Sequence, residues 1–519
     1  MGSLNVDRVL RPWVALPPAV RLALLGAATA ATYTLGFALP YPISVGLARP
    51  LQQFARITGP SLGPTLGLVV TLLVLFALYL AAIATARQCA DRRGMAIVLG
   101  AGALSTLALL VTYPLFSLDI FYYMSADRIW SVYHENPFVV PPLQAAHDPF
   151  FPYTAWGHYP LPYGPLWPWL TRFTGSAGGG DIGRTLLAFK ALSSAAYLLA
   201  IPAVAWAAAP LGPGRRVVAS CAFAWNPLVL IELVGNGHND AVALLPTVLA
   251  VGFWLRGPSA PTVWALCVSF LVKATVAVAV PAFLVAGIRD ALTRGRFRRW
   301  MLTSAAPVLG LTVLAWLPFR NGPTTGFLRE TQQYFHSPTA VVAALLTARA
   351  PEWRASAVEL TQILLLVCFA GYYFSQLRTL SQEGPRALGA VWRIFVLYFV
   401  VVSPFFSPWY VVWPVATAAI LGNARTRAFS TALSFGAMCT YLVQFVLRPV
   451  SGGLPGTAAL GAMSIAVATA PMLAYWAATT QTARRVTGAA SWPAKRVAVA
   501  QMERRPRSEG GSVVRSRAQ

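Results

Sequence analysis

Windows of about 20 consecutive apolar residues recur along this chain, and they constrain its fold more than any other feature. A helix of ~20 apolar residues is long enough to cross the hydrocarbon core of a bilayer. Of the 519 residues, 57% are hydrophobic and only 11% are charged, and the mean hydropathy is +0.60. Because backbone groups inside a bilayer must be hydrogen-bonded internally, such windows form helices. The sequence therefore predicts an all-α, polytopic integral membrane protein.

The formal net charge of +24 fits either nucleic-acid binding or basic loops on the cytoplasmic side of a membrane. The basic residues fall in short loops between apolar windows and in the C-terminal tail, so we expect a lipid bilayer and no nucleic acid as partner. By the positive-inside rule, RQCADRR at 87–93, RDALTRGRFRR at 289–299 and both termini are cytoplasmic. Alternation of sides then places the loop at 116–184 on the extracytoplasmic side of the cell membrane.

Apolar length and loop charge together predict about 13 or 14 transmembrane helices within residues 1–482. The basic tail at 483–519 lacks apolar periodicity and is expected to be disordered on the cytoplasmic face. One helix is predicted near 217–234. Residues 257–288 are too long for one ordinary span and are basic at both ends, so two short helices with Lys273 near the bend are predicted there.

Asp119 directly follows a predicted span, so its carboxylate should lie at the outer boundary of the membrane. A carboxylate there can act as a general base that takes a proton from a hydroxyl attacking a lipid-linked electrophile. The alternatives are a helix N-cap and an interfacial ion pair with Arg128. Asp127, Arg128 and Glu135 are candidate substrate-binding residues of the same site. Solvated or arginine-paired carboxylates on a loop helix are the alternative for Asp127 and Glu135.

Aromatic residues and prolines are dense in the second half of this loop, notably in YPLPYGPLW at 159–167. They can form a rigid wall on which sugar rings stack while polar side chains donate hydrogen bonds. Asn136, His158 and Tyr163 are the candidate substrate-binding residues here. The alternative is an aromatic belt at the bilayer surface, although a belt does not require the interleaved histidines and carboxylates.

A second concentrated stretch, FAWNPLVLIELVGNGHND at 223–240, places polar side chains inside and directly after an apolar span. A carboxylate in such a span is costly unless it faces the protein interior or an aqueous cavity. The stretch can bind sugar hydroxyls or a phosphate through Glu232, Asn236, His238, Asn239 and Asp240. Capping of the next helix by Asn239 or Asp240 is the alternative. These residues lack the spacing of a metal site, so no cofactor is expected, and a divalent ion on outer carboxylates stays open.

Basic residues that are candidates for holding a phosphate are Lys273 at the predicted bend, Arg320 and Arg329 on a later outer loop, and Arg448. Snorkelling to lipid headgroups is the alternative for Lys273. The segment SPWYVVWP at 407–414 begins a short helix with a proline in its first turn. Its Trp409 and Tyr410 are candidate substrate contacts, and an aromatic belt is again the alternative.

Several segments together resemble the bacterial GT-C membrane glycosyltransferases, and above all the polyprenol-phosphate-mannose-dependent α(1→6)-mannopyranosyltransferases. These segments are SLDIFYY at 117–123, the Asn136-Pro137 turn, YGPLW at 163–167, WNPLVLIELVGNGHND at 225–240 and SPWYVVWP at 407–414. The resemblance implies a site on the outer leaflet side, a polyprenyl-phosphate-linked sugar donor, and transfer with inversion to a glycan or glycolipid acceptor. It also implies that Asp119 is the catalytic base.

Two other functions are weighed against mannosyl transfer. A transporter or lipid flippase should carry its ionisable residues near the bilayer midplane on repeated, broken helices. Here the carboxylates and histidines collect in the predicted outer loops, which favours an enzyme. Within the enzyme class, transfer of arabinofuranose or another sugar from the same kind of carrier is the alternative.

Overall fold

The computed structural model describes residues 12–443, except Pro60, Pro258, 321–336 and 381–383, together with Ala466, Thr469, Met472 and Leu473. The chain divides into two compact units, Met1–Pro471 and Met472–Gln519, and the first contains nearly all of the described residues. The predicted tail at 483–519 and most of the last predicted span near 457–479 lie outside the described residues.

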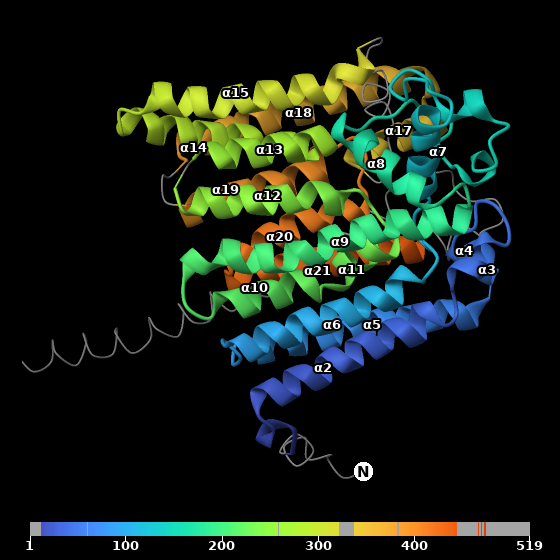
Figure 1. Cartoon of the computed structure of the whole chain (residues 1–519), viewed down its shortest axis with the longest axis horizontal. Helices are drawn as coiled ribbons and strands as arrows, with labels where there is room; N and C mark the ends of the chain where they lie inside the picture. The colour runs from blue at the N-terminus through green and yellow to red at the C-terminus, as the bar shows by residue number, and fades with distance from the viewer. Residues whose placement is uncertain are drawn as a thin grey trace, which may run out of the picture. The chain divides into compact units, whose positions relative to one another are not determined.

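Long apolar helices make up most of the first unit (Figure 1). Among the described residues, seven helical segments are long and apolar enough to cross a membrane. They are α2 (Pro18–Tyr33) with η1 (Thr34–Ala38), α5 (Leu62–Ala86), α6 (Arg92–Leu110), α9 (Ile182–Ala208) with η4 (Ala209–Leu211), α15 (Phe297–Trp316) with η7 (Leu317–Phe319), η8 (Pro351–Trp353) with α18 (Arg354–Arg378), and α19 (Gly384–Leu397) with η9 (Tyr398–Val402). The regular structure described is helical apart from one isolated β-bridge, Pro42 to Thr112. The predicted all-α, polytopic membrane fold is confirmed.

The helix predicted near 217–234 is broken. It bends by 57° between α10 (Arg215–Ala224) and the segment formed by α11 (Pro227–Leu230) and the π-helical η5 (Ile231–Gly235). Pro227 has no N–H to donate to the preceding turn. The Asn226 side chain caps the new helix by accepting a hydrogen bond from the Leu228 N–H at 3.0 Å. The break leaves Glu232 on a π-helical turn, a form that is frequent at functional sites.

Residues 257–288 form two helices, as predicted. α13 (Ala260–Val272) ends at Lys273, whose backbone is extended, and α14 (Val280–Thr293) follows the 3-10 turn η6 (Ala274–Val278). Other short apolar helices occupy the positions of further predicted spans, namely α12 (Asp240–Leu255) and η10 (Pro408–Val411) with α20 (Val412–Leu421). The described chain continues into α21 (Ala424–Leu442).

The polar loop at 116–184 is itself folded. It contains α7 (Asp119–Ser131), the 3-10 turns η2 (Pro142–Ala145) and η3 (Phe151–Tyr153), and α8 (Leu166–Ala177). The Arg128 Nε atom lies 2.7 Å from Asp148 Oδ2, and this ion pair ties α7 to the turn before η3. Figure 1 shows α7 and α8 at one end of the bundle, the same end that carries α3 (Ile43–Leu47), α4 (Phe54–Thr58) and α17 (Pro338–Arg349).

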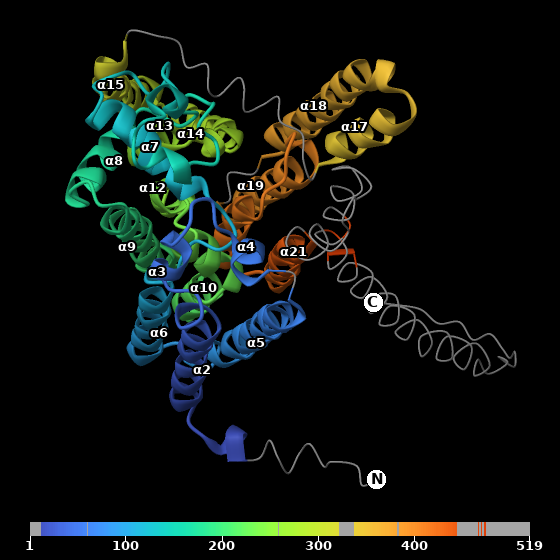
Figure 2. The same ribbon diagram turned by 90° about the vertical axis from the view of Figure 1, so that its right-hand side faces the viewer.

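The two ends of the bundle differ in charge. Figure 2 looks onto the end that carries α7 and α8, and in both views α9 and α12 lie between α2, α5 and α6 on one side and α13, α14 and α15 on the other. The basic turns at 87–93, 215–216 and 289–299 lie at the opposite end (Figure 1). Along the sides of the bundle, α15 and α18 expose apolar side chains, as expected for helices in contact with lipid; examples are Leu309, Val313, Leu364 and Val367.

Candidate active site

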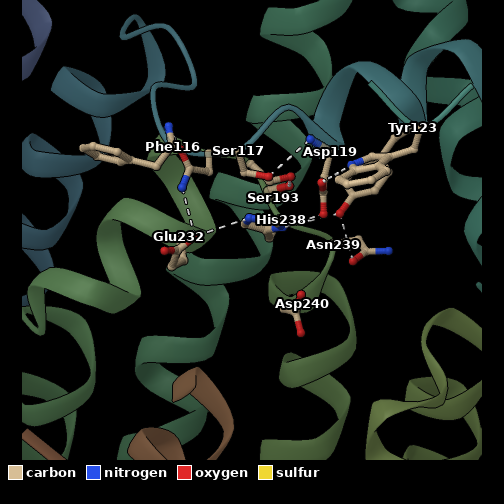
Figure 3. Close-up of polar contacts among 12 residues, drawn as sticks. Phe116, Ser117, Asp119, Tyr123, Ser193, Glu232, His238, Asn239 and Asp240 are labelled. Atoms are coloured by element: carbon tan, nitrogen blue, oxygen red, sulfur yellow. Dashed lines mark hydrogen bonds and ion pairs between the residues drawn. The ribbon is translucent and has the colours of Figure 1, made fainter. Parts of the chain in front are cut away.

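A sharp turn after η5 brings the GNGHND stretch against the first turn of α7 (Figure 3). Gly237 has φ of +71°, and a Cβ atom on it would lie 2.5 Å from the Ile120 Cδ1 atom. Glycine meets both requirements, because it has no Cβ and tolerates positive φ. The Gly237 carbonyl accepts a hydrogen bond from the Ser193 hydroxyl at 3.1 Å, and the Lys190 ammonium donates to the Gly235 carbonyl. α9 therefore fixes the turn that presents His238 to Asp119.

Asp119 is the first residue of α7, and its side chain is 16% exposed. The Trp156 indole N–H donates a hydrogen bond to Asp119 Oδ1 at 3.1 Å. Leu118 holds the N-cap position and the Asp119 side chain makes no capping bond, so the N-cap alternative is wrong. The ion pair with Arg128 is also not formed, because Arg128 binds Asp148 instead. Asp119 remains open to an approaching hydroxyl on the surface of the site.

His238 is fully buried and lies between two carboxylates (Figure 3). Its Nδ1 atom is 3.7 Å from Asp119 Oδ2, and its Nε2 atom is 3.3 Å from Glu232 Oε2. The Trp409 ring stacks on the imidazole with centroids 4.3 Å apart and an interplanar angle of 26°. The Tyr123 hydroxyl lies 3.5 Å from His238 Nδ1. Stacking on Trp409 thus orients the imidazole, whose two nitrogens lie nearest to Asp119 and Glu232 respectively.

Glu232 is buried and is held by neutral hydrogen-bond donors. The Asn236 amide donates to Glu232 Oε2 at 2.9 Å, and the Tyr441 hydroxyl donates to Oε1 at 2.8 Å. Asn236 Oδ1 in turn accepts the backbone N–H of Phe116 at 3.3 Å, which links this cluster to the segment that leads into α7. Glu232 therefore faces the protein interior, one of the two placements that its position in an apolar span allowed.

Asp240 and Lys273 form a buried ion pair behind the histidine. Lys273 Nζ lies 2.6 Å from Asp240 Oδ2 and donates to Asn239 Oδ1 at 3.0 Å. The Trp413 indole N–H donates to Asp240 Oδ1 at 2.9 Å. Lys273 lies at the end of α13, near the bend as predicted, and Asp240 and Asn239 hold its ammonium in a buried position. The rings of Tyr163 and Tyr410 lie 5.4 and 5.9 Å from Nζ.

The structure brings together one set of the predicted site residues: Asp119, Tyr163, Glu232, Asn236, His238, Asn239, Asp240, Lys273, Trp409 and Tyr410. The side chains that hydrogen-bond to this set include some that were not singled out from the sequence, namely Tyr123, Trp156, Trp413 and Tyr441. Trp156 and Trp413 stand in the aromatic segments noted above. The sequence carries no signal for Tyr441, which is 209 residues from Glu232.

A second set of predicted residues lies outside the cluster. Asp127 is buried and accepts a hydrogen bond from Ser131 at 3.1 Å, and a Cβ atom on Gly175 of α8 would touch its carboxylate. Burial raises the pKa of Asp127 from 3.8 to about 6. The Asn136 amide donates to the Phe319 carbonyl at 3.4 Å. Arg128 is ion-paired with Asp148, whereas the side chains of Glu135, His158 and Arg320 are exposed. The hypothesis that Asp127 and Glu135 share a site with Asp119 is therefore not supported by their placement.

The side chains of the cluster that could bind a metal ion do not point at a common position. The two nitrogens of His238 face different carboxylates, Asp119 and Glu232, so a single ion cannot be bound by all three side chains in this arrangement. Over the residues that the structure describes, there is no group of three or more His, Cys, Asp or Glu side chains arranged to hold a metal ion.

The fold and the cluster define a class, a polytopic helical membrane protein with a compact carboxylate and histidine site beneath a folded loop. A family model described as alpha-(1->6)-mannopyranosyltransferase, N-terminal domain, matches residues 21–289, more than half of the chain. The chain belongs to this family. The matched range contains Asp119, Glu232, His238, Asp240 and Lys273.

Individual relatives agree with the family model. Alpha-(1->6)-mannopyranosyltransferase A of Mycobacterium tuberculosis is 26% identical over 337 residues, which cover 61% of this chain and 64% of that protein. A probable alpha-(1->6)-mannopyranosyltransferase of Mycolicibacterium smegmatis is 28% identical over 160 residues, 29% of this chain and 28% of that protein. The match thus spans less than two thirds of the length of each of these relatives. No solved structure matches the chain significantly.

Proposed function

We propose that this protein is a membrane mannosyltransferase that uses Asp119 as its general base. The observation that carries the proposal is the placement of Asp119 within a member of the α(1→6)-mannopyranosyltransferase family. Among the three clustered carboxylates, Glu232 and Asp240 are fully buried, whereas Asp119 is 16% exposed. Asp119 is therefore the carboxylate that a substrate hydroxyl can reach.

The proposed reaction is a direct displacement with inversion. The acceptor oxygen forms a bond to the anomeric carbon as the bond from that carbon to the phosphate oxygen breaks, and the electron pair leaves on the phosphate. Asp119 accepts the proton of the acceptor hydroxyl as positive charge develops on the sugar ring. A β-linked mannosyl phosphate then gives an α-mannoside. General base catalysis of this kind contributes roughly 10²- to 10⁴-fold to the rate.

The donor that fits this position is a polyprenyl-phosphate-linked mannose. The cluster lies at the end of a bundle whose α15 and α18 helices expose apolar side chains, so a lipid-linked substrate can present its head group there. Lys273 is the ammonium at the inner wall of the cluster, and we propose that it faces the donor phosphate together with the rings of Tyr163 and Tyr410. Trp409 offers an aromatic face for the sugar.

The transfer needs no metal ion in this proposal. A phosphate monoester is a competent leaving group when a fixed cation stabilises its charge. We expect EDTA to leave the transfer rate unchanged, and restoration of activity by Mg²⁺ or Mn²⁺ after EDTA treatment would contradict this part of the proposal.

The active end is proposed to face the extracytoplasmic side. The basic turns at 87–93, 215–216 and 289–299 lie at the other end of the bundle, and short basic loops are retained in the cytoplasm. The acceptor is then a glycan or glycolipid of the cell envelope. A reporter fused within 116–184 that is accessible only from the cytoplasm would contradict this orientation.

The test is an assay with membranes that contain the full chain, radiolabelled polyprenyl-phosphate-mannose and an oligomannoside acceptor. We expect an α(1→6)-linked product from the wild type and a loss of at least about 100-fold in Asp119→Asn. Equal product from both would exclude Asp119 as the base. If product forms only from polyprenyl-phosphate-arabinofuranose, the transferred sugar is arabinofuranose and not mannose. If no polyprenyl-linked sugar gives any product, a transporter or flippase is favoured.

A further inference from the structure

We propose that His238 and Glu232 form a proton relay behind Asp119, in which Glu232 is a positioning residue that never touches the substrate. This inference rests on the proposed function, because it concerns the proton that Asp119 takes from the acceptor. It changes the role that the sequence suggested for Glu232 and His238, which was binding of sugar hydroxyls or phosphate. The relay begins at Asp119, the exposed carboxylate of the cluster, and passes the proton to the buried His238.

The hydrogen bonds around Glu232 identify it as an acceptor. The Phe116 N–H can only donate, so Asn236 Oδ1 must face it, and the amide NH₂ group must then face Glu232 Oε2. The Tyr441 hydroxyl donates to the other carboxylate oxygen. Both oxygens of Glu232 thus accept hydrogen bonds from neutral donors, and in the proposed relay this side chain is a carboxylate.

An ionised Glu232 sets the tautomer of His238. The negative charge of Glu232 then favours a proton on Nε2, which is 3.3 Å from Glu232 Oε2, although the two atoms do not form a hydrogen bond in this structure. The other nitrogen, Nδ1, is left with its lone pair directed towards Tyr123 and Asp119, whose Oδ2 atom is 3.7 Å away. Neither contact with a carboxylate is a hydrogen bond in this structure, and catalytic hydrogen bonds are often long or poorly aligned until substrate binds.

Charged and titratable groups from several elements surround His238. α7 contributes Asp119 and Tyr123, η5 contributes Glu232, and α21 contributes Tyr441 through its bond to Glu232. α12 contributes Asp240, which is paired with Lys273 of the hairpin, and α9 contributes Lys190 beneath the turn. Asp240 is paired with Lys273, so Asp119 and Glu232 are the carboxylates that face the two nitrogens of His238. The Trp409 ring from η10 stacks on the imidazole and contributes no charge.

The relay moves one proton and leaves every other atom in place. The acceptor O–H proton passes to Asp119 Oδ2 as the glycosidic bond forms and the polyprenyl phosphate leaves with the bonding electron pair. Asp119 then passes the proton to Nδ1 of His238, and the resulting imidazolium lies between two carboxylates. After product release the proton returns through Asp119, the exposed member, to solvent. Asp119 is thus a carboxylate again before the product has left.

The experiment measures kcat/KM against pH for the full-length protein in detergent, with polyprenyl-phosphate-mannose and an oligomannoside. In Glu232→Gln the acid limb of the profile is expected to move to lower pH by about one unit or more, because the carboxylate no longer holds the proton on His238. Glu232→Asp keeps the charge and is expected to keep the wild-type position of the limb, even at a lower rate. The double variant Glu232→Gln with His238→Gln is expected to have the profile of His238→Gln alone.

The matched control is Asp290→Asn, which also replaces an acid by its amide. Asp290 lies near the C-terminal end of α14, the end far from Lys273, and the pH profile of this variant should equal that of the wild type. An acid limb in Glu232→Gln that stays at the wild-type pH would overturn the relay. If Glu232→Gln does not fold, His238→Gln decides the question, with kcat expected to fall about tenfold or more at an unchanged KM for the donor. An unchanged kcat there would overturn the relay, whereas absence of transfer by the wild type would overturn the proposed function instead.

Discussion

Replacing Lys273 by methionine should be among the most destabilising changes at this site. Lys273 Nζ lies 2.6 Å from Asp240 Oδ2, and the two side chains are 9% and 0% exposed. At an effective dielectric constant of ~20, two unit charges at this distance attract by roughly 6 kcal/mol before desolvation is considered. Without Lys273, Asp240 keeps only the Trp413 donor among the contacts described here. Removal of one partner of a buried pair typically costs about 3–5 kcal/mol, and we expect a loss in this range.

The assay is denaturant unfolding of the purified protein in detergent, followed by near-UV circular dichroism. The pair Lys273→Met and Asp240→Asn should lose clearly less stability together than the sum of the two single changes, because no unpaired charge is then buried. Arg296→Met is the matched control, since Arg296 lies at the same 2.6 Å from Asp290 but is 46% exposed, and its loss should stay within about 1 kcal/mol. A loss below about 1 kcal/mol for Lys273→Met, or strictly additive single losses, would refute the reasoning.

Three further changes test the surroundings of the cluster. Gly237→Ala should lower the rate of mannosyl transfer about tenfold or more, because the new Cβ would press on Ile120 and an alanine is strained at this positive φ. Wild-type activity of the variant would contradict this expectation. Trp156→Phe should lower kcat several-fold through loss of the hydrogen bond to Asp119, and an unchanged kcat would show that the bond has no role. Burial raises the pKa of Asp127 to about 6, so ionisation lowers stability as pH rises from about 4 through 6, by at most ~3 kcal/mol. Asp127→Asn stays neutral and should remove that part of the pH dependence in thermal unfolding; an unaltered dependence would exclude Asp127 as its source.

The bulk of the fold follows from local properties of the sequence. Apolar windows and basic turns gave the positions of the long helices, because helix length and loop charge are set by the bilayer rather than by distant contacts. The split of 257–288 at Lys273 was predicted on the same grounds, and the structure has it. The break at Asn226-Pro227 was missed, although a proline after a capping residue is a local signal for it.

The candidate site was predicted only in part. The stretches around Asp119 and His238 were recognised because polar residues stand out beside apolar spans. Within the loop, the sequence singled out Asp119 as the base and offered Asp127 and Glu135 as further members of its site, whereas the structure directs Asp127 towards α8 and leaves Glu135 exposed. Which side of a loop helix faces the site depends on how α7 packs, and charge and hydropathy along the chain do not encode that packing.

The sequence by itself determined that this chain is a helical membrane protein with one polar loop and one polar turn rich in acid and amide groups. Only the tertiary structure decided that the loop and the turn meet, with His238 between Asp119 and Glu232. It also decided that Glu232 is held by Tyr441, 209 residues away, and Asp240 by Trp413, 173 residues away. Contacts at such separations follow from the packing of whole helices, and a buried carboxylate is stabilised by whichever donors that packing brings within hydrogen-bond distance.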